Sequence, residues 1–138
     1  MMLLLDTGPF VALLCGDDPH HHWARTCLGE HRGTLLTCDA VLGETCFVLR
    51  RDGRDPEAAF QMIERGIVRL AFNLAEEFAA VQALFTRYRN VPASLADACL
   101  VRMSEQHAGS KVMTLDSDFL IYRRTRSKPV PVLTPLPV

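Results

Sequence analysis

The sequence has few of the features that identify a general nucleic-acid-binding or membrane protein. Its 15 Lys and Arg residues are balanced by 16 Asp and Glu residues, and a net charge of −1 creates no overall positive field to attract a polyanion. Aromatic residues make up 7% of the chain, with one Trp and two Tyr, which argues against extensive stacking on bases. No apolar run approaches the roughly 18 residues of a membrane span, so we expect no membrane association.

Paired cysteines and a targeting segment are also missing. The five cysteines form no CxxC pair, are odd in number, and mostly have apolar neighbours, so we interpret them as reduced core residues. The apolar start of the chain has no preceding basic residue and is interrupted by Asp6, unlike a signal peptide. We therefore expect a cytoplasmic protein.

The residues that are present predict an α/β domain. With 138 residues, of which 49% are hydrophobic and 22% charged, the chain suits a single domain covering residues 1–138. Short apolar runs alternate with longer helical patterns, which is typical of a mainly parallel sheet. We expect about five strands, near residues 2–5, 34–37, 67–72, 111–115 and 130–133. The expected helices cover residues 9–15, 20–31, 40–51 with Asp39 as N-cap, 56–65, 76–89 and 95–107, and a short turn covers 118–124.

Four carboxylates lie at the ends of apolar segments or inside them: Asp6, Glu44, Asp97 and Asp116. An ionised carboxylate that is buried without a partner costs several kcal/mol, or it gives up its charge through a raised pKa. Ligands of parallel sheets gather beyond the carboxyl ends of the strands, which is where Asp6 and Asp116 stand. In the strand order 3-2-1-4-5 the two strands that carry them are neighbours, about 4.8 Å apart. The helical residues Glu44 and Asp97 could project into the same crevice.

Carboxylates alone are ligands for Mg²⁺ or Mn²⁺ rather than for zinc, which favours His and Cys. A divalent ion held in this way activates water and polarises a phosphoryl oxygen, so phosphodiester hydrolysis is the natural chemistry.

Other functions stay open on the residues alone. A phosphatase of the haloacid-dehalogenase type also begins with an aspartate followed by Thr7, but it needs a second aspartate where Gly8 stands. A phospho-receiver would have its acids clustered at the first strand, whereas these are spread over the chain. A non-catalytic nucleic-acid-binding protein is a further alternative. The four acids could also be ordinary helix caps or surface residues, but this interpretation fits Asp6 poorly.

Four sequence blocks follow one another along nearly the whole chain. They are Leu5-Asp6-Thr7-Gly8-Pro9-Phe10-Val11-Ala12-Leu13-Leu14, then Glu44 in a mid-chain helix, then Ser94-Leu95-Ala96-Asp97-Ala98, and finally Thr114-Leu115-Asp116-Ser117-Asp118-Phe119 with Tyr122-Arg123. In this order the blocks resemble the PIN domain, in particular the VapC-type toxins.

The resemblance implies a compact three-layer α/β/α fold and the activity of a metal-dependent endoribonuclease, a hydrolase. Such proteins are often homodimers and are often the toxin of a type II toxin-antitoxin pair, encoded beside a small antitoxin. The resemblance gives catalytic and Mg²⁺- or Mn²⁺-binding roles to Asp6, Glu44, Asp97 and Asp116, an accessory metal role to Asp118, and orienting roles to Thr7 and Thr114. A solitary PIN nuclease, or a PIN domain that only binds nucleic acid, is the alternative.

Two groups of arginines are candidates for contacts with RNA, because guanidinium groups near an acidic crevice can hold the flanking phosphates. Arg50 and Arg51 follow Glu44 on its helix, while Arg123, Arg124 and Arg126 lie in a tail that has no acid after Asp118. The apolar excess on the helices expected at 56–65 and 76–89 is either core or the face of a homodimer.

Overall fold

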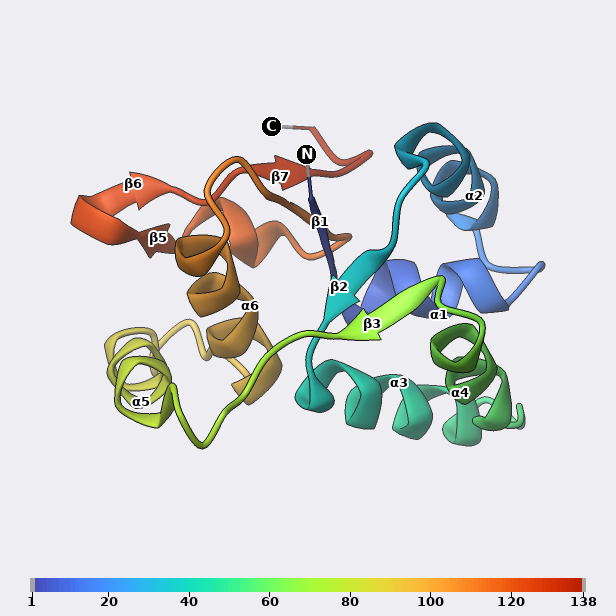
Figure 1. The fold of residues 1–138 in the computed structure, drawn as a ribbon, viewed down its shortest axis with the longest axis horizontal. Coiled ribbons are helices and arrows are strands. Elements are labelled where there is room, and N and C mark those ends of the chain that lie inside the picture. The colour runs from blue at the N-terminus through green and yellow to red at the C-terminus, as the bar shows by residue number, and fades with distance from the viewer. Residues whose placement is uncertain (1, 138) are drawn as a thin grey trace.

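A five-stranded parallel sheet forms the centre of the molecule (Figure 1). The structure, a computed structural model, describes residues 2–137 apart from the side chain of Arg126. The strands are β1 (Leu3–Leu5), β2 (Leu35–Thr37), β3 (Val68–Leu70), β4 (Lys111–Met113) and β7 (Val132–Leu133), and they lie in the order β3-β2-β1-β4-β7. Since β7 is the fifth strand of this sheet along the chain, the predicted order 3-2-1-4-5 is confirmed.

The central strand β1 sets the position of everything at the carboxyl edge of the sheet. All three of its leucines are buried, as expected for a parallel strand that is covered on both faces. Leu5 is in register with Met113 of β4, and the Asp6 N–H donates to the Met113 carbonyl at 3.1 Å. Asp6 and Thr114, the next residue of each strand, therefore leave the sheet side by side.

Helices cover both faces of the sheet, which confirms the α/β/α class (Figure 1). On one side lie α1 (Thr7–Leu14), α2 (His21–His31), α3 (Asp39–Arg51) and α4 (Glu57–Glu64); on the other lie α5 (Phe78–Arg87) and α6 (Leu95–Gln106). The buried start of α6 packs on β1 and β4, and α3 contacts both α1 and α6. These contacts bring α1, α3 and α6 together at the carboxyl edge of the sheet.

The local predictions were wrong in two places. Asp39 is not the N-cap of α3: it is the first helical residue and exposed, and the cap is Cys38, whose side chain makes no capping hydrogen bond. The short turn expected at 118–124 is a 3-10 helix, η1 (Ser117–Leu120), and an antiparallel pair, β5 (Arg123–Arg124) with β6 (Lys128–Pro129), joined by η2 (Thr125–Ser127). Two-residue strands are too short for side-chain alternation to reveal them.

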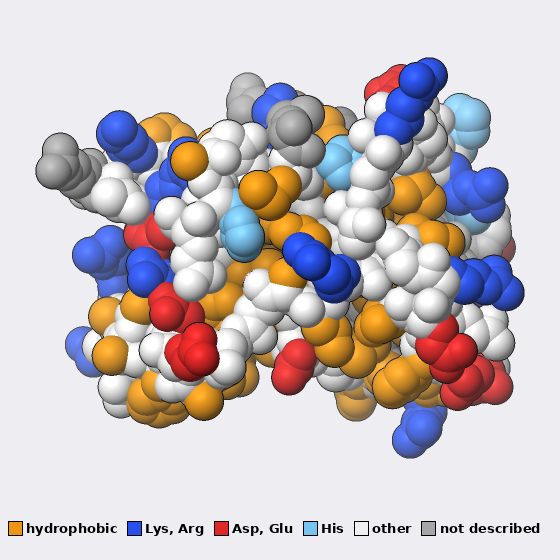
Figure 2. Space-filling model, viewed as in Figure 1, with side chains coloured by type: hydrophobic (Ala, Val, Ile, Leu, Met, Phe, Trp, Pro, Cys, Tyr) orange, Lys and Arg blue, Asp and Glu red, His pale blue; other side chains and the backbone are white. Residues whose placement is uncertain are grey.

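The molecular surface combines scattered charge with a few exposed aromatic groups. On the face shown in Figure 2, Lys and Arg side chains are spread out, while hydrophobic side chains gather at the lower left, where Figure 1 places α5. Phe78 and Phe85 of this helix are 58% and 45% exposed. Within residues 2–137, no helix is both long enough and apolar enough to cross a membrane.

Candidate active site

Asp6 follows the central strand and is almost fully enclosed, with 5% of its surface exposed. It is the N-cap of α1, and its Oδ1 accepts a hydrogen bond from the Thr7 N–H at 2.8 Å. Its Oδ2 accepts from the hydroxyl of Thr114 at 2.7 Å. The pKa of Asp6 is raised to about 7, mainly by burial and to a smaller extent by the charges of Asp97 and Asp116, against the effect of both hydrogen bonds. A proton or a cation is needed to compensate this carboxylate at neutral pH.

The loop after β4 connects Asp6 to two more aspartates. The hydroxyl of Thr114, which donates to Asp6, also accepts from the Asp116 N–H at 2.9 Å. Asp116 in turn caps η1, because its Oδ1 accepts from the Asp118 N–H at 2.9 Å. One buried hydroxyl therefore fixes the ends of two neighbouring strands relative to each other.

Gly8 allows α1 to lie close to this loop. A Cβ atom at position 8 would be 3.3 Å from the Cβ of Leu115, closer than ordinary packing. The missing side chain keeps the first turn of α1 beside the segment that leads into Asp116.

Asp97 comes from the first turn of α6, where a capping box fixes it. The Asp97 N–H donates to the Ser94 hydroxyl at 3.0 Å, and Asp97 Oδ2 accepts from the Ser94 N–H at 3.4 Å. The hydroxyl of Tyr122 donates to the same Oδ2 at 2.7 Å. Burial raises the pKa of Asp97, although the hydrogen bond from Tyr122 opposes this rise.

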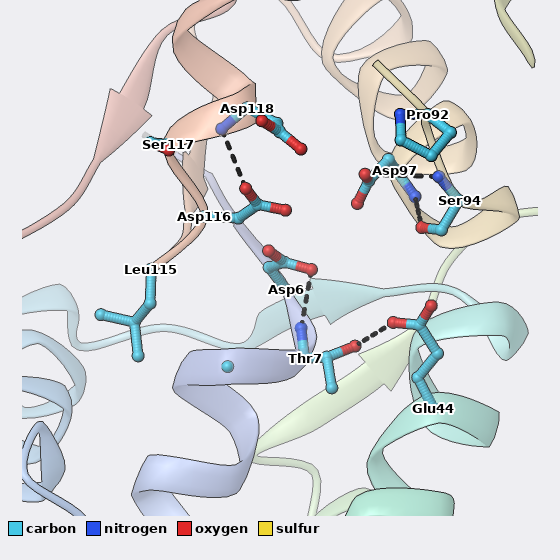
Figure 3. A pocket seen from close by; sticks show the side chains of 11 residues that line it. Asp6, Thr7, Glu44, Pro92, Ser94, Asp97, Leu115, Asp116, Ser117 and Asp118 are labelled. Carbon is cyan, nitrogen blue, oxygen red and sulfur yellow. Dashed lines mark hydrogen bonds between the residues drawn. The ribbon is translucent and has the colours of Figure 1, made fainter. Parts of the chain in front are cut away.

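Glu44, on α3, completes the acidic set. Its Oε2 accepts a hydrogen bond from the Thr7 hydroxyl at 2.9 Å. Thr7, which directly follows Asp6, therefore holds the Glu44 carboxylate in place. Figure 3 shows the five carboxylates around one opening, into which Asp6, Asp97, Asp116 and Asp118 project. This pocket of about 560 Å³ is lined by Asp6, Thr7, Gly8, Glu44, Pro92, Ser94, Asp97, Leu115, Asp116, Ser117 and Asp118.

The lining of the pocket fits a hard divalent cation in its chemistry. Its charged groups are five carboxylates, and neither Lys nor Arg is among the lining residues. Within residues 2–137, no three His, Cys, Asp or Glu side chains enclose a ready-made metal position. Mutual repulsion opposes a closer approach of the carboxylates when nothing neutralises them. Asp6 is buried and accepts two side-chain hydrogen bonds, but no Lys or Arg side chain that the structure describes pairs with it, and this is the strongest sign that the pocket takes a cation.

Comparison with known proteins agrees with this arrangement. The sequence profile of the PIN domain matches residues 3–124. The chain belongs to the PIN domain family. Among solved structures, this PIN domain is similar to VapC20 of Mycobacterium tuberculosis, described as a sarcin-ricin loop cleaving toxin: the TM-score is 0.75 at 22% identity, over 92% of this chain and 99% of that one. That likeness concerns the fold. A search of curated proteins found no match.

None of the predicted arginines whose side chains the structure describes lines the acidic pocket of this PIN domain. Arg50 and Arg51 line a separate pocket on α3 together with Cys46 and Phe47, and Arg51 pairs with the neighbouring Asp52 at 3.1 Å.

The tail arginines that the structure describes have structural partners. Arg123 Nη1 donates to the carbonyls of Leu120, Ile121 and Tyr122, and Arg124 Nη1 donates to the Ser104 carbonyl at 2.7 Å. The side chain of Arg126 lies outside the described part of the chain. These contacts fasten the tail to α6 and η1; an RNA contact by any of the arginines remains a prediction.

Ser94 and Tyr122 donate hydrogen bonds to the acids of this site but are absent from the sequence-based prediction of its residues. Ser94 belongs to one of the sequence blocks that carry the family resemblance, and its spacing from Asp97, three residues apart as in a capping box, was the available signal for its contacts. Tyr122 belongs to the sequence block that carries the family resemblance, but nothing in the sequence indicates that its hydroxyl reaches a residue 25 positions earlier.

Proposed function

We propose that this PIN domain is a Mg²⁺- or Mn²⁺-dependent endoribonuclease that acts as a VapC-type toxin. The observation that carries the proposal is the convergence of carboxylates from β1, α3, α6 and the loop after β4 on one pocket. At its base lies Asp6, whose pKa burial raises to about 7. Burying a carboxylate among other carboxylates is costly for folding, and binding a divalent cation offsets that cost.

In this proposal each residue has a defined role. Asp6, Glu44, Asp97 and Asp116 would hold the ion, with Asp118 as an accessory ligand. When bound, the ion supplies Lewis-acid stabilisation of the phosphoryl charge and a nucleophile at neutral pH. Thr7 orients Glu44, and Thr114 orients Asp6, through the hydrogen bonds that each hydroxyl donates.

The open side of the pocket admits an RNA phosphodiester. The arginines on α3 and in the tail would contact phosphates farther along the same strand, because a long polyanion extends well beyond the acids that act on one bond.

The shared fold with a toxin that cleaves the sarcin-ricin loop supports the choice of RNA as substrate and a toxin role. The match of residues 3–124 to the PIN domain also sets the haloacid-dehalogenase and receiver alternatives aside. We propose a cytoplasmic protein, in keeping with five free cysteines. We propose a small antitoxin that inserts a basic side chain into the acidic pocket. A homodimer would cover Phe78 and Phe85 of α5 in an isologous contact.

The test is cleavage of structured RNAs, including a sarcin-ricin loop hairpin, with Mg²⁺ or Mn²⁺ and with EDTA. We expect the wild type to cleave only with metal, and Asp6→Asn and Asp97→Asn to lose cleavage. Asp39→Asn, an exposed change on α3, is the matched control and should retain it. Cleavage in EDTA, or full activity of both site variants, would contradict the proposal. Intact Mn²⁺ binding without cleavage of any RNA would favour a non-catalytic nucleic-acid-binding PIN domain.

A further inference from the structure

Tyr122 is fully buried, with a relative exposure of 0%. Tyrosine is rarely enclosed to this degree unless its hydroxyl has a partner, because an unpaired buried hydroxyl is costly. The ring is packed edge-on against two others, with centroid distances of 5.0 Å to Tyr88 and 5.2 Å to Phe119. The hydroxyl donates to Asp97 Oδ2 at 2.7 Å. The aromatic cluster therefore aims one polar atom at one carboxylate of the pocket.

This hydrogen bond joins two parts of the site that arrive on different elements. Tyr122 comes two residues after the end of η1, and its N–H donates to the Asp118 carbonyl at 3.2 Å. The N-cap of η1 is Asp116, so Tyr122 belongs to the same short segment as two of the acids. Asp97 belongs to α6, which comes before β4 in the chain. The Tyr122 hydroxyl thus connects the Asp116 and Asp118 segment directly to the carboxylate on α6.

The two oxygens of Asp97 have different surroundings. Oδ2 accepts from the Tyr122 hydroxyl and, at 3.4 Å, from the Ser94 N–H. Oδ1 accepts no hydrogen bond from the residues that the structure describes, and Asp97 lines the pocket with Asp6 and Asp116 (Figure 3). The donors hold one oxygen on the protein side and leave the other for a ligand.

We propose that Tyr122 is a positioning residue that holds Asp97 with one oxygen directed at the pocket and fixes α6 relative to the Asp116 segment. The inference rests on the proposed function only in taking Asp97 as a metal ligand. Donors that orient ligating carboxylates typically contribute 10–100-fold to metal affinity. Removing the Tyr122 hydroxyl therefore weakens metal binding even though Tyr122 does not touch the ion.

The structure offers a matched pair of variants. Tyr122→Phe removes the hydroxyl and keeps the ring that packs on Tyr88 and Phe119. Tyr88→Phe removes the same atom from the neighbouring ring, where the hydroxyl accepts from the Arg123 N–H at 2.8 Å and bonds to no carboxylate in the described part of the chain. Both variants lose one hydrogen bond of the same cluster, buried at Tyr122 and partly buried at Tyr88, but only the first loses a contact with Asp97.

The primary measurement is the dissociation constant of Mn²⁺, by calorimetry on RNA-free protein at pH 7.5, with thermal melting in EDTA to establish that each variant is folded. We expect Tyr122→Phe to weaken Mn²⁺ binding by about tenfold or more, and Tyr88→Phe to change it by less than about twofold. The Mn²⁺ concentration for half-maximal RNA cleavage should rise by the same factor in Tyr122→Phe, while the KM for RNA stays unchanged.

Each other outcome overturns the inference. Wild-type Mn²⁺ affinity in Tyr122→Phe, or an equal loss in both variants, shows that the hydroxyl does not position Asp97. Failure to fold in Tyr122→Phe alone shows a structural role in place of a positioning one. If the wild type does not bind Mn²⁺, or Asp97→Asn binds it as tightly as the wild type, the proposed function fails together with the inference.

Discussion

Replacing Asp6 with Asn should make the metal-free protein more stable at neutral and alkaline pH. Burial raises the pKa of Asp6 from 3.8 to about 7, so the folded protein holds this proton to a higher pH than the unfolded chain does. The proton-dependent stability is therefore fully present below about pH 4 and is lost as the pH rises through about 7. The free energy of unfolding of the metal-free wild type should fall over this range.

The size of the effect follows from the shift in pKa. Three pKa units, at about 1.4 kcal/mol each, correspond to at most about 4 kcal/mol by pH 8. For a chain of this length, this amounts to a decrease of at most roughly 14 °C in melting temperature. Asparagine has no charge to lose, and its amide can keep both contacts: the oxygen accepts from the Thr7 N–H, and the nitrogen donates to the Thr114 hydroxyl.

Urea and thermal unfolding between pH 5 and pH 8 in EDTA measure this difference. The stability of Asp6→Asn relative to the wild type should increase with pH, while Asp39→Asn, the exposed control on α3, should parallel the wild type. Adding Mn²⁺ at pH 8 should stabilise the wild type but not Asp6→Asn, because only a ligand that binds the folded state raises its stability. Parallel pH profiles of the wild type and Asp6→Asn would refute the reasoning about burial. Equal stabilisation of both by Mn²⁺ would refute the role of Asp6 as a ligand.

Two further substitutions separate the hydroxyl groups from the acids that they hold. Thr114→Val should lower the free energy of unfolding in urea by about 1–3 kcal/mol, because the Asp116 N–H loses its acceptor and Asp6 loses its donor. Thr114→Ser keeps the hydroxyl and should retain most of the wild-type stability. Equal losses of stability in the two variants would contradict the role of the hydroxyl. Glu44→Gln keeps the hydrogen bond from Thr7, so its unfolding free energy should change by less than about 0.5 kcal/mol. Its Mn²⁺ affinity, measured by calorimetry, should nevertheless fall at least about tenfold, and unchanged affinity would remove Glu44 from the ligand set.

The arrangement of the sheet could be predicted because strong local signals coincide with simple rules of topology. Leu3–Leu5 is a short run of leucines that ends at an aspartate, and a strand covered on both faces requires such a run. Parallel strands end at the same edge of the sheet, so the positions of Asp6 and Asp116 followed from the order of the strands. The acids on helices were harder to place, because a helix position does not say which neighbouring element its side chain will meet.

The contacts that depend on precise tertiary positions could not be predicted. Tyr122 reaches Asp97 only because η1 turns the chain back onto α6, and no local pattern encodes that turn. Arg123 and Arg124 were candidates for phosphate contacts because of their charge, yet their guanidinium groups bind backbone carbonyls of the tail and α6. Composition shows that arginines are present but not which acceptors lie within their reach.

The position of β1 between β2 and β4 has a consequence for the timing of synthesis. The Thr114 hydroxyl that holds Asp6 comes from a residue 108 positions later in the chain. During translation Asp6 therefore emerges long before Thr114, and until β4 follows, one edge of β1 has no partner. A growing chain carries an incomplete set of acids until Asp116 and Asp118 have left the ribosome. The acidic pocket is therefore incomplete until the loop after β4 has been made.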